Sequence, residues 1–263
     1  MAELNYTCHG EGLPVVCIHG FQADHNLMEE CLEPIFRQRK GYQRLYVDMP
    51  GMGLSRAPLE YATADNVLST LLEFIDQHVS GPFLLAGQSY GGYMAQGILH
   101  RKWEKIKGML LMVPVVDPDR NKRTIDLAHY QKRDERFLET LGEKDRLAFE
   151  EDMVVCDRER YLRYHQVITE AFGRDDPPFI EKLCKNYAFS FNPNAECDVP
   201  VLLLTGRQDT CVGWKDQQKL IPLYHRSSFV TMDEAGHNLQ LDQPKLFEVL
   251  VGFWLDRIEQ GGL

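Results

Sequence analysis

The chain contains 263 residues, of which 44% are hydrophobic and 26% are charged, the proportions of an ordinary globular protein rather than of a disordered or fibrous one. A chain of this length can bury a large core without disulfides or metal ions. Its formal charge of −10 disfavours binding to nucleic acid or to an anionic membrane surface. Seven scattered cysteines without a C-x-x-C pair, and an N-terminus without a basic segment leading into an apolar one, predict a cytoplasmic protein with reduced thiols.

Short apolar runs rich in branched residues alternate with amphipathic stretches in the first block of the chain, residues 1–116. This alternation is typical of a buried, mostly parallel sheet with helices on its faces. Residues 63–80 carry their apolar side chains on one helical face behind a threonine cap, which predicts a crossover helix. We expect strands over residues 4–8, 15–18, 44–47, 83–87 and 109–113.

The middle block, residues 117–196, is dense in charged residues, and its apolar residues recur at helical spacing. Prolines at positions 177, 178 and 193 divide it, so we expect several short helices packed as a cap. The last block, residues 197–263, returns to the first pattern, with strands expected over 201–206 and 228–232 and a helix over 245–259. The sequence therefore predicts an α/β core, residues 1–116 and 197–263, interrupted by an all-helical cap.

The segment Gly87-Gln88-Ser89-Tyr90-Gly91 lies between a predicted strand and a helix-compatible stretch. It matches the G-x-S-x-G nucleophile elbow, a sharp turn that presents the serine hydroxyl. Glycines suit this turn because neighbouring backbone comes too close for a side chain. The pattern arises by chance in about one chain in ten of this length, so it requires partner residues.

A serine hydroxyl becomes a good nucleophile only when a base removes its proton, and the base needs a carboxylate that fixes its tautomer. His237 and Asp209 each follow a predicted strand in the last block. The order Ser89, Asp209, His237 places all three beyond the carboxyl ends of strands, where an open α/β sheet has its site. Asp117 and Asp233 are competing candidates for the acid, although Asp233 is close in sequence to His237.

A tetrahedral intermediate also needs hydrogen-bond donors for its oxyanion. His19-Gly20-Phe21 directly follows the predicted strand over residues 15–18, and Tyr90 follows the serine. We expect the backbone N–H groups of Phe21 and Tyr90 to form the oxyanion hole.

Taken together, these features resemble the α/β-hydrolase superfamily, specifically its small intracellular enzymes with a helical cap. The landmarks, in chain order, are residues 10–14 before a strand ending in His19-Gly20-Phe21, the segment Asp48–Ser55, the elbow at Ser89, then Asp209 and Gly236-His237. The resemblance implies the α/β-hydrolase fold and a structural rather than catalytic loop at Asp48–Ser55. It also implies about seven strands rather than eight, because the chain begins too late for the usual additional first strand.

We expect a carboxylesterase-like serine hydrolase that cleaves a small ester or related acyl substrate through an acyl-enzyme intermediate. Ser89 would attack the carbonyl, and His237, oriented by Asp209, would carry the proton. The strands show neither clustered metal ligands nor a G-x-G-x-x-G loop, so we expect no metal and no cofactor. Apolar residues near the ends of the middle block could line the pocket or belong to the core of the cap; these are Val115, Val116, Phe189 and Phe191.

Three alternatives remain open on the sequence. A proline-iminopeptidase-like aminopeptidase would explain Gly91-Gly92 and the large cap, although Tyr90 replaces the usual tryptophan, and Glu150, Glu151 or Glu170 could then bind a substrate amine. A carbon–carbon bond hydrolase or lyase could use the same three residues. A ligand-binding protein on a hydrolase scaffold is disfavoured, because all three positions of the triad are filled.

Overall fold

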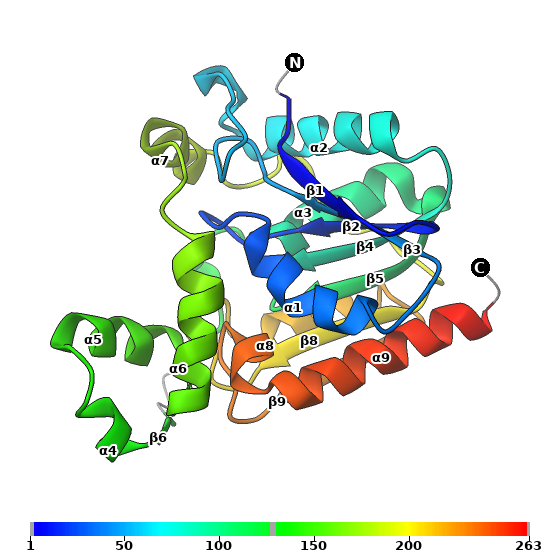
Figure 1. The fold of residues 1–263 in the computed structure, drawn as a ribbon. Coiled ribbons are helices and arrows are strands. Elements are labelled where there is room, and N and C mark those ends of the chain that lie inside the picture. The colour runs from blue at the N-terminus through cyan, green and yellow to red at the C-terminus, as the bar shows by residue number, and fades with distance from the viewer. Residues whose placement is uncertain (1–2, 127–129, 262–263) are drawn as a thin grey trace.

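The computed structural model describes residues 3–126 and 130–261. Seven strands form the main sheet in the order β1-β3-β2-β4-β5-β8-β9 (Figure 1). The edge strand β1 (Tyr6–His9) is antiparallel to β3, and all other neighbours are parallel. The remaining strands are β2 (Leu13–Ile18), β3 (Tyr42–Val47), β4 (Phe83–Gln88), β5 (Ile106–Met112), β8 (Val201–Gly206) and β9 (Ser227–Met232). The prediction of a mostly parallel sheet of about seven strands is confirmed.

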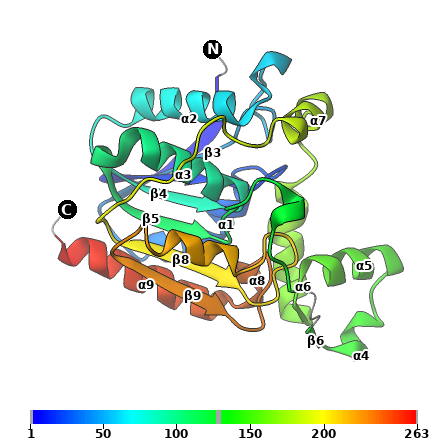
Figure 2. The ribbon, with the colours of Figure 1, turned by 180° about the vertical axis from the view of Figure 1, so that it is seen from behind.

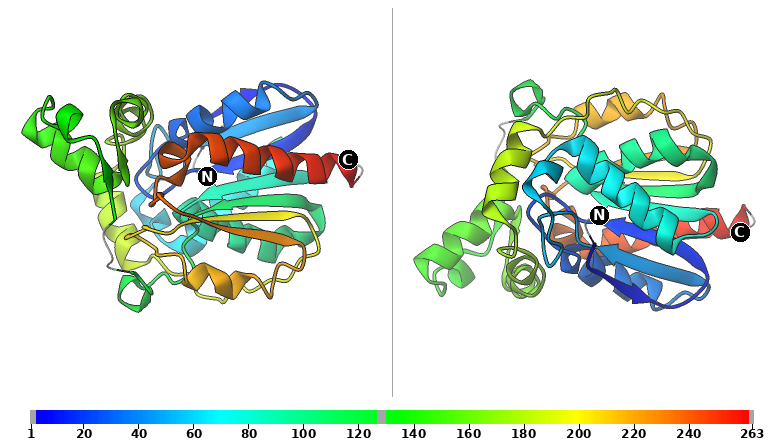
Figure 3. Two further views of the ribbon diagram at one scale, coloured as in Figure 1. Left: turned by 90° about the horizontal axis from the view of Figure 1, so that it is seen from below. Right: turned by 90° about the horizontal axis from the view of Figure 1, so that it is seen from above.

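Helices cover both faces of this sheet. The helices α1 (Asn26–Phe36) and α9 (Pro244–Gln260) lie on one face, and α2 (Ala64–His78) and α3 (Tyr90–Lys102) lie on the other, as the rear view and the end views show (Figures 2 and 3). The hydroxyl of Thr63 accepts the N–H of Asn66 at 3.2 Å and caps α2, as its sequence predicts. The sheet is thus buried between two helical layers, which explains the continuous apolar runs of its central strands.

Helix α9 shows how the sequence pattern becomes packing. Phe247, Val251 and Trp254 are buried against the sheet, whereas Phe253 on the opposite side of the helix is exposed. The buried indole of Trp254 donates its N–H to the carbonyl of Pro200 at 3.0 Å, so its polar atom is satisfied inside the core.

The helices between β5 and β8 lie at the carboxyl ends of the strands, whereas the chain after residue 185 runs back along α3 before it enters β8 (Figures 1 and 2). These helices are α4 (Glu135–Leu138), α5 (Glu143–Asp152), α6 (Arg158–Tyr164) and α7 (Pro177–Lys185), with a π-helical turn at His165–Thr169. We call residues 117–196 the inserted segment. The short helix α8 (Leu239–Asp242) belongs to the last block of the chain. Single 3₁₀ turns occur at Leu59–Tyr61, Trp103–Lys105, Arg120–Lys122 and Asp216–Leu220.

The expectation of an all-helical insertion is wrong in one respect. The short strands β6 (Lys132–Arg133) and β7 (Val155–Cys156) pair in parallel as a separate two-stranded sheet. The N–H of Lys132 donates to the carbonyl of Val154, and the N–H of Asp134 donates to that of Cys156, both at 2.9 Å. The apolar run around β7 is too short to show a period, so only these distant partners define it as a strand.

Among the described residues, no helix has both the length and the apolar character needed to cross a membrane.

Candidate active site

The register of the parallel strands brings several loops to one edge of the main sheet. Because parallel strands point the same way, β2, β4, β8 and β9 all end at this edge, and the residues after them share it. The strands are held in step by the pairs Ile18 with Gly87, Gln88 with Met112, Met112 with Leu204 and Gly206 with Met232. The loops that leave this edge carry His19, Ser89, Asp209 and His237.

Ser89 lies on a strained turn between β4 and α3. Its backbone has φ 53° and ψ −114°, a left-handed conformation that a residue with a side chain rarely adopts. A Cβ on Gly91 would overlap the carbonyl oxygens of Ile18 and His19, and one on Gly87 would come within 2.5 Å of the carbonyl oxygen of Gly91. Both glycines of the motif are therefore required by close backbone approach.

Three side chains form a continuous hydrogen-bonded relay at this edge. The Nε2 atom of His237 lies 2.9 Å from the Oγ of Ser89, and its Nδ1 lies 2.9 Å from an oxygen of Asp209. The other oxygen of Asp209 accepts the backbone N–H groups of Cys211 at 2.8 Å and Val212 at 2.9 Å. Because a carboxylate only accepts, Nδ1 carries the proton and Nε2 is left to accept the proton of the serine.

The other two carboxylates considered for the acid have different partners. Asp117 accepts the N–H of Asp119 at 3.0 Å, and Asp233 accepts the amide of Gln208 at 2.8 Å. Of the three candidates, Asp209 is the one bonded to His237.

The environment of His237 shifts its pKa in opposing directions. Burial lowers the pKa of this imidazole, but the neighbouring Asp209 carboxylate and the Cys211 thiol raise it more, and the net result is a pKa well above the ordinary 6.5. Burial raises the pKa of the Cys211 thiol, but the positive charge on His237 outweighs it and the net pKa is lowered. Cys211 was not predicted from the sequence, where its signal is its place two residues after Asp209.

Two backbone N–H groups next to Ser89 have no acceptor among the described residues, those of Phe21 and Tyr90. Gly20 abuts the serine, because a Cβ on Gly20 would lie 3.4 Å from the Cβ of Ser89. Tyr90 is the first residue of α3, whose N-terminal dipole favours negative charge. Free N–H groups in this position are suited to an oxyanion.

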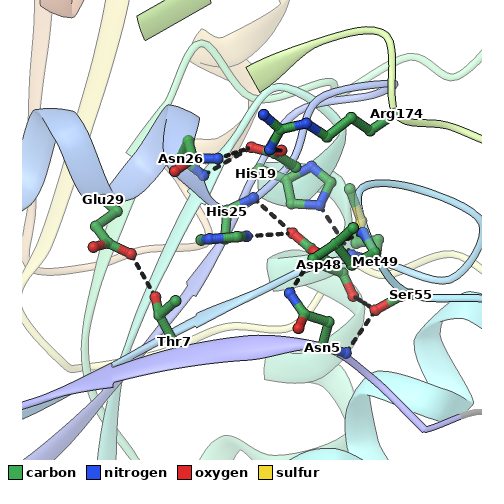
Figure 4. Close-up of polar contacts among 12 residues, drawn as sticks. Asn5, Thr7, His19, His25, Asn26, Glu29, Asp48, Met49, Ser55 and Arg174 are labelled. Carbon is green, nitrogen blue, oxygen red and sulfur yellow. Dashed lines mark hydrogen bonds and ion pairs between the residues drawn. The ribbon is translucent and has the colours of Figure 1, made fainter. Parts of the chain in front are cut away.

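His19 fixes the loop that carries Gly20 and Phe21. Its ring is fully buried; Nδ1 donates to the carbonyl of Gly20 at 2.7 Å, and Nε2 accepts the N–H of Met49 at 2.9 Å (Figure 4). Burial lowers the pKa of His19, in keeping with a neutral ring that donates once and accepts once. The ring therefore ties the Gly20 loop to the segment Asp48–Ser55.

Asp48 organises that segment from a buried position beside the site (Figure 4). It accepts the backbone N–H of His25 at 2.7 Å, the ring nitrogen of His25 at 2.8 Å, the amide of Asn5 at 2.8 Å and the N–H of Leu54 at 2.9 Å. Burial raises the pKa of Asp48, but the hydrogen bond from His25 and the other donors prevail and lower it to about 2. These bonds hold the segment Asp48–Ser55 in place, in line with the structural rather than catalytic loop expected from the sequence.

A cavity of about 1010 Å³ opens over Ser89 and His237. The inserted segment supplies much of its apolar wall, including Met153, Ile168 and Phe172. The cavity is therefore enclosed jointly by the loops of the main sheet and by the inserted segment.

Comparison with known proteins identifies this architecture. Residues 15–248 match the model of the Alpha/beta hydrolase family. The chain belongs to this family. An alpha/beta superfamily hydrolase from Oenococcus oeni PSU-1 is 31% identical with a TM-score of 0.90, over 97% of this chain and 96% of that one. A 2-hydroxy-6-oxo-6-(2'-aminophenyl)hexa-2,4-dienoic acid hydrolase from Metapseudomonas resinovorans is 25% identical, over 93% of this chain and 84% of that protein. A thermophilic esterase from Thermogutta terrifontis, 21% identical over 98% of this chain and 94% of that one with a TM-score of 0.73, shares the fold.

The apolar lining of this hydrolase differs from the sequence expectation. Of the four residues proposed at the ends of the middle block, Val115 lines the cavity, whereas Val116, Phe189 and Phe191 do not. Phe189 instead stacks on Tyr93 at 4.2 Å and on Phe191 at 5.0 Å between ring centroids. These aromatic residues therefore pack the inserted segment against α3.

The three glutamates considered for binding a substrate amine differ in their positions and partners. Glu150 and Glu151 line the cavity, but Glu150 is paired with Arg133 at 2.8 Å. Glu170 does not line it and lies 3.4 Å from Arg174. Glu150 and Glu170 are therefore paired with arginines, whereas Glu151 is exposed, lines the cavity and forms no ion pair with any described residue.

Asp242 is a buried carboxylate that connects the inserted segment to the loop carrying His237. It was not predicted from the sequence. Asp242 accepts the N–H groups of Val154 and Val155 on one oxygen and that of Gly236 on the other, each at 2.9 Å. Burial raises the pKa of Asp242 to about 6. Asp242 thus fixes β7 against the residue that precedes His237.

Proposed function

We propose that this hydrolase cleaves a small acyl substrate through a covalent acyl-enzyme on Ser89, with His237 as the base and Asp209 as its orienting acid. The observation that carries the proposal is the relay of two 2.9 Å hydrogen bonds, from Asp209 to His237 and from His237 to Ser89, at the floor of the cavity. We further propose that residues 117–196 act as a cap over this site.

The reaction follows from the geometry in two halves. His237 takes the proton of Ser89 as the Ser89 oxygen bonds to the substrate carbonyl carbon, and the resulting oxyanion accepts the N–H groups of Phe21 and Tyr90. The intermediate collapses, the bond to the leaving group breaks, and His237 returns the proton to that group. Water then attacks the acyl-enzyme with His237 as base, which releases the carboxylic acid and restores Ser89.

A fluorophosphonate probe tests the nucleophile directly. We expect one probe adduct on the intact protein, mapped to Ser89 by mass spectrometry, and no adduct on Ser89→Ala. The matched control is Ser69→Ala, an exposed serine of α2, which retains the adduct. An unlabelled but correctly folded protein, or an adduct that persists in Ser89→Ala, contradicts the proposal and favours a ligand-binding protein on the same scaffold.

The chemistry of the cleaved bond is tested with a substrate panel. We expect turnover of p-nitrophenyl esters, with Ser89→Ala as the blank. Exclusive turnover of proline p-nitroanilide instead would identify an aminopeptidase and overturn the esterase assignment.

A second candidate is the hydrolysis of a carbon–carbon bond by the same residues. The Metapseudomonas resinovorans relative is named for an oxo-dienoic acid, a compound without an ester, so its hydrolysis must break a carbon–carbon bond. If no ester is hydrolysed but a 2-hydroxy-6-oxo-dienoic acid is cleaved by the intact protein and not by Ser89→Ala, this second function replaces the first.

A further inference from the structure

Arg123 is a partly buried cation without a counter-charge. Its Nε donates to the carbonyl of Asp117 and its Nη1 to the carbonyl of Cys211, both at 3.0 Å. Its Nη2 is buried and has no acceptor within the described part of the chain, where no carboxylate comes within ion-pair distance of this guanidinium. A partly buried charge without an ion pair is costly unless another group neutralises it.

This guanidinium lies next to the catalytic relay and lines the same cavity. Cys211, whose carbonyl it binds, donates its own N–H to Asp209 at 2.8 Å. On its other side Arg123 is close to Tyr187: burial raises the pKa of that phenol and the Arg123 charge acts against the rise. The ring of Tyr187 packs against Tyr90 with centroids 4.3 Å apart. Arg123 therefore lies between the turn at Cys211, which follows Asp209, and Tyr187, whose ring packs against Tyr90.

A second arginine, at the start of the 3₁₀ turn that precedes Arg123, also lines the cavity. Arg120 is exposed and forms no ion pair with any described residue. Arg120 and Arg123 thus give the cavity positive charge that no ion pair within the described residues neutralises.

Three acidic residues line the cavity from one segment, residues 150–152, and Glu151 among them is exposed and forms no ion pair with any described residue. Glu150 is paired with Arg133, and Asp152 accepts the hydroxyl of Tyr164 at 2.8 Å. The carbonyl of Asp152 accepts the amide of Asn238 at 3.2 Å, so this acidic segment adjoins the histidine loop, whereas Arg123 binds the Cys211 turn. The basic and the acidic lining residues therefore belong to different segments of the chain, and a ligand carboxylate would be placed at the arginines.

We propose that Arg123 and Arg120 form an anion subsite, and that the substrate is an acyl compound whose own carboxylate binds there while its carbonyl faces Ser89. Two carbonyls fix the guanidinium of Arg123, and its buried Nη2 lies out of a ligand's reach. Its Nη1 and the exposed guanidinium of Arg120 would supply the donors, and such charge-assisted bonds to a carboxylate are strong. This inference rests on the proposed acyl-transfer function and names its substrate class.

Three p-nitrophenyl esters with the same spacer test the subsite: the valerate, the hydrogen glutarate and the 4-aminobutyrate, whose chains end in a methyl, a carboxylate and an ammonium group. We expect kcat/KM for the hydrogen glutarate to exceed that for the valerate by about tenfold or more, because one completed charged hydrogen bond is worth that factor. Arg120→Met and Arg123→Met are each expected to lower this ratio by about tenfold. Arg136→Met, at an exposed arginine of α4 away from the cavity, leaves the ratio unchanged.

Equal rates for the valerate and the glutarate, or a preference for the aminobutyrate, overturn the subsite. An equal fall for both esters in Arg123→Met and in Arg120→Met, with the ratio intact, shows that the arginines only support the fold and also overturns it. If no ester is cleaved, the proposed acyl transfer fails, and the subsite is judged by calorimetry of glutarate binding to Ser89→Ala. Binding that Arg120→Met removes supports the subsite, and absence of binding refutes it.

Discussion

The imidazole of His237 contacts a hydroxyl on one side and a carboxylate on the other, and a thiol lies beside it. Only the neutral ring can accept the proton of Ser89, so activity is expected to rise with pH as the ring loses its proton. Because Asp209 and Cys211 raise the pKa of His237 more than burial lowers it, the half-maximal pH is expected above 6.5.

Asp209→Asn tests this balance of charges. Without the carboxylate, burial acts with less opposition and the pKa of His237 falls, so the half-maximal pH for kcat/KM moves to lower pH. The wrong tautomer is also favoured, and kcat is expected to fall by about 10⁴. The pH profile of p-nitrophenyl ester hydrolysis measures both effects. Asp233→Asn, at the neighbouring loop, is the control; a half-maximal pH that does not move in Asp209→Asn refutes this role.

At the scale of elements, one carboxylate links parts of the chain that lie far apart in sequence. Asp242, the last residue of α8, binds the N–H groups at β7 in the inserted segment and the N–H of Gly236 before His237. The position of the inserted segment and that of the histidine loop therefore depend on the same group.

Asp242→Asn is expected to disturb both. The amide retains one acceptor oxygen but turns its NH₂ group toward a backbone N–H, and a buried unpaired donor costs about 1–3 kcal/mol. The free energy of unfolding, measured with urea, should fall by about that amount, and kcat should fall because His237 is less well positioned. Asp145→Asn, at an exposed aspartate of α5, is the matched control. A destabilised variant with unchanged kcat would show that Asp242 acts on stability alone.

For the whole molecule, two buried aspartates give opposite contributions to stability as the pH changes. The pKa of Asp48 is lowered from 3.8 to about 2, so the stability it adds is present above about pH 4 and is lost as the pH falls toward 2. The pKa of Asp242 is raised from 3.8 to about 6, so the folded state binds its proton more readily and stability falls as the pH rises from about 4 to 6.

Asp48→Asn should therefore destabilise the protein in a pH-dependent way. We expect the wild type to exceed the variant in free energy of unfolding by about 2 kcal/mol at pH 7, and this difference to disappear near pH 2. Urea unfolding at both pH values measures it. A difference that is the same at both values would mean that the carboxylate charge of Asp48 contributes nothing.

Much of this architecture is already determined by local sequence. The strands and the crossover helix follow from apolar periodicity, and the strained turn at Ser89 follows from the glycines at 87 and 91, because backbone conformation and burial are properties of short segments. The order of Ser89, Asp209 and His237 is equally visible in the sequence.

The tertiary structure alone decided which distant groups meet. Ser89 and His237 are 148 positions apart, and the choice of Asp209 over Asp117 and Asp233 depends on where each loop ends in space. No periodic or local signal predicts the pairing of β6 with β7, the bonds that Asp242 accepts from two segments, or the position of Arg123, since each depends on contacts between remote segments. Local preference fixes the elements, whereas the chemistry of the site depends on distances that only folding sets.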